Sequence, residues 1–198
     1  MLLALAQLAQ AAEPARPLPR IVNGVPSDAY PAVGALISPS SGATFCTVSM
    51  IGCQTALTAA HCVCGGGNTG PACPDGSALA DPATLNVYLS QAGVFGVSAI
   101  SVTPNFEFAE AGDVALLHLD APVEGLPPLP INTVASPPFG TLGTLVGYGV
   151  TNFGVADDAG IKRRGKVVTG SCAGSVPESE HLCWSFETPP GAPGEDSN

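Results

Sequence analysis

The sequence predicts an all-β fold, and three observations lead to this prediction. Turn-forming residues are frequent, with 24 glycines and 20 prolines among 198 residues. The segments between them are short and rich in Leu, Val, Ile and Thr, which is typical of strands. In one of them Leu85, Val87 and Leu89 fall on one face, as in a half-buried strand. Many short strands joined by tight turns form a β-sandwich or a β-barrel.

Candidate strands follow one another along the chain. Two short ones, 48–51 and 56–58, are separated by a turn at Gly52, and a glycine-rich loop then runs from Cys64 to Cys73. Further candidate strands lie within residues 84–90, 94–106, 113–119, 140–149, 162–170 and 181–187. The proline-rich stretch 121–132 is typical of a linker between two halves.

The beginning of the chain has the pattern of a targeting segment. Residues 1–11 hold a short apolar run and then small residues, which predicts a secretory signal peptide cleaved after Ala11. Residues 12–20 would then form a short propeptide. The apolar run is too short for a transmembrane helix, so we expect a soluble, secreted chain without a membrane partner.

Composition and charge exclude several classes of protein. With 45% hydrophobic and 11% charged residues, the chain is not disordered for lack of apolar side chains. Its net charge of −10 argues against a nucleic-acid partner. No Lys or Arg occurs from Ile21 to Gly160, and four basic residues then cluster at Lys162, Arg163, Arg164 and Lys166.

Seven cysteines in a secreted chain favour disulfides. His61, Cys62 and Cys64, with Cys53 and Cys73 nearby, offer the side chains that bind zinc. However, the short spacing of a zinc site is not repeated at a second place, and secretion oxidises thiols. We therefore expect no metal and no other cofactor. A redox or metal protein would require free thiols on the secreted form.

Four short motifs occur in a specific order: Arg20 followed by Ile-Val-Asn-Gly at 21–24, Leu-Thr-Ala-Ala-His-Cys at 57–62, Asp-Val-Ala-Leu-Leu at 113–117, and Gly-Tyr-Gly at 147–149. Pro-Asn-Phe at 104–106 and Cys46 ahead of Cys62 fit the same pattern. In this order and spacing, the motifs resemble those of the trypsin/chymotrypsin-like serine protease family. The resemblance covers nearly the whole chain from Arg20 onward.

The resemblance implies a double antiparallel β-barrel. Its first barrel would occupy residues 21–120 and be complete. An inter-barrel linker would cover 121–135. Residues 136–198 would form a second barrel that is incomplete, because they hold fewer candidate strands than a barrel of this family.

The resemblance also implies a catalytic pair. A hydroxyl group is a poor nucleophile until an imidazole takes its proton, and a carboxylate behind the imidazole holds it in one tautomer. His61 matches the general base and Asp113 the orienting carboxylate. His118 and His181 lie in no such motif, so we expect both to be ordinary strand or surface residues.

The disulfide pattern follows partly from the resemblance. It pairs Cys46 with Cys62, beneath His61, and Cys172 with Cys183. Cys53, Cys64 and Cys73 then leave one cysteine over. A local Cys64–Cys73 bridge is our first expectation, and Cys53–Cys64 is the alternative.

In this family an activating protease would cut after Arg20, and the freed amino group of Ile21 would pair with an aspartate beside the nucleophile. That nucleophile lies in a Gly-Asp-Ser-Gly-Gly-Pro loop, and this sequence stops before such a loop. Ser197 has none of the loop's neighbours, and we do not propose it as the nucleophile. Asp196 and Asn198 lie near the position that sets specificity, but their register is undefined.

The resemblance therefore predicts a secreted serine endopeptidase, made as a zymogen, that acts on protein or peptide substrates as a monomer. We expect these 198 residues to be a fragment without hydrolytic activity of its own. The alternative is an inactive, protease-like binding protein, but such proteins usually lose the His or Asp, and both are intact here. If the enzyme cuts after basic residues, the Arg163–Arg164 pair is the predicted self-cleavage site.

Overall fold

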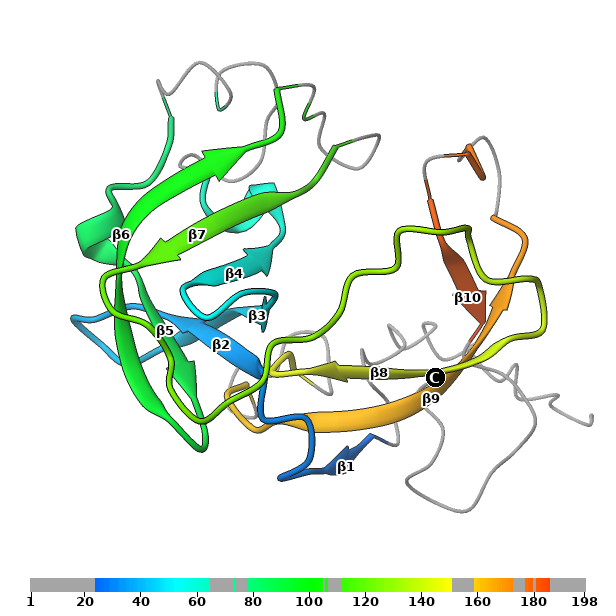
Figure 1. Ribbon diagram of the computed structural model, residues 1–198, viewed down its shortest axis with the longest axis horizontal. Helices are drawn as coiled ribbons and strands as arrows, with labels where there is room; N and C mark the ends of the chain where they lie inside the picture. Colours follow the sequence, from blue (N-terminus) through cyan, green and yellow to red (C-terminus); the bar gives the residue numbers. More distant parts are fainter. Residues whose placement is uncertain are drawn as a thin grey trace, which may run out of the picture.

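The computed structural model describes residues 24–64, 73, 78–104, 106, 112–150, 159–172, 177–179 and 181–185. Its strands form two groups, a closed barrel and a second, smaller sheet (Figure 1). The expectation of an all-β fold with a complete first barrel and an incomplete second one is confirmed.

Six strands close into an antiparallel barrel, with the spatial order β2-β3-β4-β7-β6-β5. The strands are β2 (Val33–Ile37), β3 (Thr44–Met50), β4 (Thr55–Thr58), β5 (Asn86–Leu89), β6 (Gly93–Val102) and β7 (Ala115–Leu119). Two short 3₁₀ helices accompany them, η1 (Ala60–Cys62) and η3 (Pro82–Thr84).

The alternation of apolar residues explains the barrel strands. In β7, Ala115, Leu117 and Leu119 are buried, while Leu116 and His118 point outward. His118 is thus a strand residue on the outer face, as expected. The predicted alternation at Leu85, Val87 and Leu89 is also correct, since all three side chains are buried.

The backbones of the paired strands β2 and β5 lie very close together at one point. Gly34 lies in β2, and a Cβ atom there would collide with the carbonyl oxygen of Tyr88 in β5. A glycine is therefore needed for the two backbones to approach each other. The buried side chains around this point include Leu36, Val48 and Leu89.

The predicted hairpin around Gly52 is present. The amide groups of Ile51 and Gly52 both donate to the carbonyl oxygen of Thr55, at 3.0 and 3.2 Å. The first strand of this hairpin is longer than expected, because it begins at Thr44.

The segment after the barrel, which the sequence suggested as a linker, lies against the barrel. Between β7 and the next strand, a part of the chain that is described throughout, no residue belongs to a strand. The amide of Val123 donates to the carbonyl of Cys53 at 2.7 Å, and that of Leu129 to Met50 at 2.8 Å. Leu126 and Leu129 also contact the barrel core.

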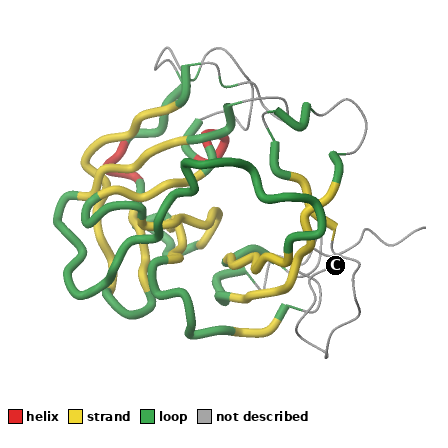
Figure 2. The backbone as a smooth tube through the Cα atoms, turned by 45° about the vertical axis from the view of Figure 1, so that its right-hand side comes forward, coloured by secondary structure: helices red, strands yellow, loops and turns green. Residues whose placement is uncertain are grey.

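The second sheet is built around β9 (Arg163–Gly170). One edge of β9 pairs with β8 (Leu142–Gly147) over the length of that strand. The other edge pairs with β1 (Val25–Pro26) at its start and with β10 (Cys183–Ser185) at its end. Figure 1 shows that the chain crosses from the barrel to the second sheet before β8 runs back toward the barrel. In the turned view of Figure 2, a long loop likewise spans the two groups of strands.

The position of β9 bears on the predicted self-cleavage site. Arg163 and Arg164 each pair with β8 on one side and with β1 on the other. Arg163 is buried as well. A protease needs an exposed, extended segment, so the folded sheet protects this bond.

Within the described residues, no helix is long and apolar enough to cross a membrane.

Candidate active site

His61 lies where the chain leaves the barrel. Strand β4 ends at Thr58, and the short helix η1 carries His61 at its centre. Ala60 is fully buried, and its carbonyl accepts hydrogen bonds from the amides of Val63 and Cys64 at 3.0 and 3.1 Å. The small residue before His61 thus anchors the turn in the core, and the imidazole remains 42% exposed.

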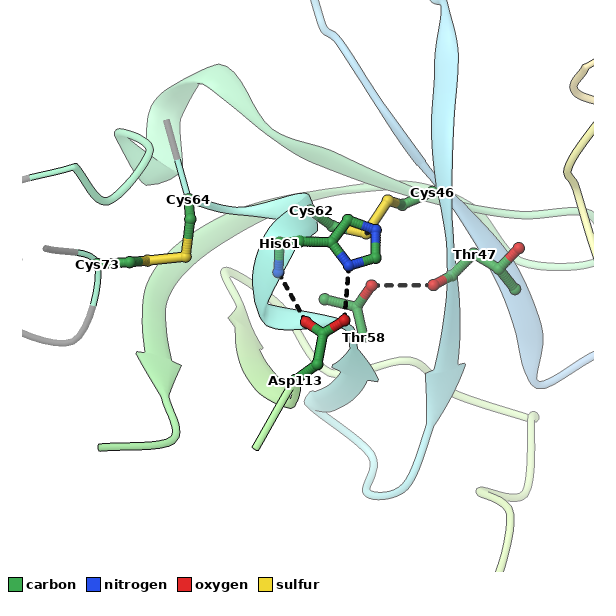
Figure 3. A network of polar contacts seen from close by, with 8 residues as sticks. All are labelled: Cys46, Thr47, Thr58, His61, Cys62, Cys64, Cys73 and Asp113. Carbon is green, nitrogen blue, oxygen red and sulfur yellow. Dashed lines mark hydrogen bonds and ion pairs between the residues drawn. A yellow bond between two sulfur atoms is a disulfide. The ribbon is translucent and has the colours of Figure 1, made fainter. Parts of the chain in front are cut away.

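Asp113 stands just before β7 and contacts His61 twice. Its Oδ2 atom is 2.7 Å from the ring nitrogen Nδ1 of His61. Its Oδ1 atom accepts the backbone N–H of His61 at 2.9 Å (Figure 3). The carboxylate therefore fixes both the ring and the backbone of the same residue.

This geometry determines the tautomer of the imidazole. An ionised carboxylate accepts hydrogen bonds and has no proton to donate, so the neutral ring carries its proton on Nδ1 and donates it in the hydrogen bond to Asp113. Nε2 is then the basic atom. The arrangement can take up a proton from a hydroxyl group and hold it as an imidazolium beside a negative charge.

The structure contains the disulfide that the resemblance placed beneath His61. Cys46, in β3, is bonded to Cys62, with their Cα atoms 6.2 Å apart. The bridge ties η1 to the neighbouring strand (Figure 3). Its Cys62 Sγ atom lies 3.6 Å from Nε2 of His61.

Cys46, His61 and Cys62 group their possible ligand atoms within 4.8 Å of one another, as a metal site would. Both sulfur atoms are bonded to each other, however, and a disulfide sulfur is not the thiolate that zinc binds. These three residues therefore do not suit zinc.

Four of the five remaining cysteines also form bridges. Cys64 is bonded to Cys73, and Cys172 to Cys183. Cys53 is free and exposed. The first expectation for the local loop thus holds, and the alternative Cys53–Cys64 bridge is wrong.

Arg20, Ile21 and Ser197 are outside the described residues. His181 is half-buried beside β10, and its Nδ1 atom is 3.1 Å from the carbonyl oxygen of Pro177.

Two threonines near the site escaped the sequence analysis. The hydroxyl of Thr58 donates to the carbonyl of Thr47 at 2.9 Å, and the hydroxyl of Thr47 accepts the amide of Tyr148 at 3.0 Å. The hydrogen bond of Thr58 could have been expected, because a polar side chain on the buried face of a strand needs a partner.

Three comparisons with known proteins bear on the family and the fold of the chain. The trypsin family profile matches residues 21–182. A comparison with curated protein sequences returned no match. Among solved structures, the VesB protease of Vibrio cholerae aligns over 77% of this chain and 45% of its own, with a TM-score of 0.55 and 23% sequence identity.

The likeness to VesB concerns the fold, and the chain spans less than half the length of that protein. The family profile shows more than the fold, because it covers most of this chain and includes both His61 and Asp113. The chain therefore belongs to the trypsin family.

Proposed function

We propose that this chain belongs to a secreted serine endopeptidase, made as a zymogen, that hydrolyses protein or peptide substrates. The observation that carries the proposal is the double contact between Asp113 and His61. A histidine with no chemical role would not need a partly exposed carboxylate to fix its tautomer and backbone together.

In the proposed reaction, Nε2 of His61 removes the proton of a serine hydroxyl as its oxygen attacks the substrate carbonyl carbon. His61 then passes that proton to the leaving amine, and the peptide bond breaks. Water enters by the same route and releases the acyl group. Asp113 keeps its negative charge throughout and stabilises the imidazolium.

The serine would belong to a Gly-Asp-Ser-Gly-Gly segment, a motif that these 198 residues do not contain. Removing the nucleophile of a serine protease costs on the order of 10⁶ in turnover. We therefore expect no measurable peptide hydrolysis by these residues alone.

Activation by cleavage after Arg20 fits the position of β1. This strand begins at Val25 and pairs with Arg164 of β9. A new amino terminus at Ile21 would remain tethered, a few residues away, to the second sheet. The proposal thus includes an activating protease as a partner and a second sheet that responds to the cleavage.

The test uses the product of the natural gene from start codon to stop codon, expressed in a secreting host. Terminal sequencing should find the secreted form beginning at Ala12 and the activated form at Ile21. Activation should give hydrolysis of a peptide library, and His61→Ala should lower kcat by about 10⁶.

An inactive, protease-like binding protein is the competing function. It predicts that the activated wild type and His61→Ala behave alike on every peptide, although both fold. Equal rates in well-folded samples would therefore rule out the proposed hydrolysis.

A further inference from the structure

Strand β3 is one of the barrel segments that contact the second sheet, and it is also linked to the turn that carries His61. Strand β3 carries Cys46, whose disulfide partner follows His61. The next residue in β3 is Thr47, which is half-buried. Figure 3 shows Thr58 below the imidazole and Thr47 to the side of it, on the adjacent strand.

Thr47 makes a different hydrogen bond with each part of the molecule. Its backbone carbonyl accepts the hydroxyl of Thr58, at the end of the strand that leads into η1. Its side-chain oxygen accepts the amide of Tyr148, at the end of β8. Thr47 thus contacts both Thr58, at the end of the strand that precedes η1, and Tyr148, directly after β8.

Gly160, which follows the loop after β8, also lies near strand β3. The amide of Gly160 donates to the carbonyl of Tyr148 at 3.0 Å, so both ends of the loop lie together. Gly160 has a φ of +90°, and a Cβ atom there would come within 3.3 Å of the Thr44 hydroxyl oxygen. The loop ends are therefore set against β3 at Thr44 and at Thr47.

We propose that Thr47 is a positioning residue, whose hydroxyl holds the Tyr148 turn of the second sheet at a fixed place relative to the His61–Asp113 pair. The inference rests on the proposed function, in which the second half of the protease supplies the nucleophile. Catalysis by proximity then depends on how the two halves are placed, and a shift of about 1 Å can cost on the order of 100-fold in rate.

The hydroxyl of Thr47 is the group to remove. Thr47→Val keeps the shape of the side chain but cannot accept the Tyr148 amide, which loses its partner. Thr47→Ser keeps the hydroxyl and should behave as wild type. Thr84→Val is the matched control, because Thr84 is exposed at the end of η3 and its hydroxyl donates to the backbone carbonyl of Asp81 rather than to the second sheet.

Two NMR readouts on the full product of the gene test the positioning without relying on activity. Thr47→Val should speed hydrogen exchange of the Tyr148 amide by about tenfold. It should also shift the ring signals of His61, whereas Thr47→Ser and Thr84→Val leave both readouts at their wild-type values.

In the active gene product, Thr47→Val should lower kcat by about 10- to 100-fold with KM within about twofold. Unchanged Tyr148 exchange, or His61 signals that superimpose on those of the wild type, would overturn the positioning role. Failure of the wild type to hydrolyse any peptide would instead overturn the proposed function, and the NMR readouts would still decide whether Thr47 couples the turn to His61.

Discussion

Asp113 uses one carboxylate oxygen for the ring of His61 and the other for its backbone. This division of roles makes Asp113→Asn informative, because a carboxamide retains one acceptor and replaces the other with a donor. If the remaining oxygen keeps the His61 amide, the new NH₂ group faces Nδ1 and favours the tautomer protonated on Nε2. Nitrogen-15 shifts of the imidazole at neutral pH should report this reversal.

The same change should lower the kcat of the active gene product by about 10⁴, the cost of the wrong tautomer in a serine protease. Asp120→Asn is a suitable control, since Asp120 follows the far end of β7. Retention of the Nδ1 proton in Asp113→Asn would show that the carboxylate does not determine the tautomer.

Cys53 gives a second prediction at the scale of single residues. It is the free cysteine of the described chain, it is exposed, and the six others are bridged. A maleimide under native, non-reducing conditions should label one thiol per molecule, counted by mass spectrometry. Cys53→Ser should abolish the labelling, and residual labelling of that variant would contradict the observed pairing.

At the scale of elements, the Cys46–Cys62 bridge closes a loop of 16 residues that contains β4 and η1. Replacing both cysteines with serine should lower the free energy of unfolding by about 3 kcal/mol in the chain-entropy model. Urea unfolding followed by circular dichroism measures this loss. The Cys172–Cys183 double variant is the comparison, because its loop of 11 residues predicts almost the same loss in a different sheet.

The strands of the barrel were largely predictable, and the partners within the second sheet were not. Alternation along β5 is a local pattern, and it predicted both the strand and its buried face, while β7 was predicted as a strand within residues 113–119. Strand β1 has two residues, too few for a pattern, and exists because β9 offers it a free edge. Which edge pairs with which distant segment is determined by packing, which short-range periodicity does not contain.

The contact between His61 and Asp113 was predictable for a different reason. His61 and Asp113 are 52 residues apart, and they could be paired because each lies in a motif that resembles one of the same family. No motif includes the contact of Thr47 with Tyr148, which are 101 residues apart, or that of Lys162 with Tyr30, which are 132 apart. Such contacts depend on how the two halves meet.

At the scale of the whole molecule, Lys162 joins three segments at the junction of the barrel and the second sheet. Its ammonium group donates to the carbonyl of Tyr30 at 3.3 Å and to the hydroxyl of Ser90 at 3.1 Å. Its own carbonyl accepts the amide of Ser27. Tyr30 has a φ of +56°, which is strained for a residue with a side chain, so Lys162 helps to hold a turn that is costly to form.

Burial lowers the pKa of Lys162, and the charge of Asp28 offsets part of this effect. Tyr148 behaves oppositely. Its hydroxyl makes no hydrogen bond with a described residue. Burial raises the pKa of Tyr148, and the nearby Ser90 hydroxyl offsets part of this effect. These two opposite shifts predict how the stability of the whole chain depends on alkaline pH.

Below its ordinary pKa of about 10.4, the unfolded chain binds a proton at Lys162 that the folded chain has begun to lose. The free energy of unfolding should therefore rise with pH between the folded pKa and that value. Above about 10, the folded chain keeps the Tyr148 proton that the unfolded chain loses, so this contribution falls as pH rises further. Urea unfolding at several pH values, in a Cys53→Ser background that prevents disulfide exchange, measures both effects. Lys162→Met should remove the rise and Tyr148→Phe the fall, and a variant that leaves its own part of the profile unchanged would show that the group has the same pKa in both states.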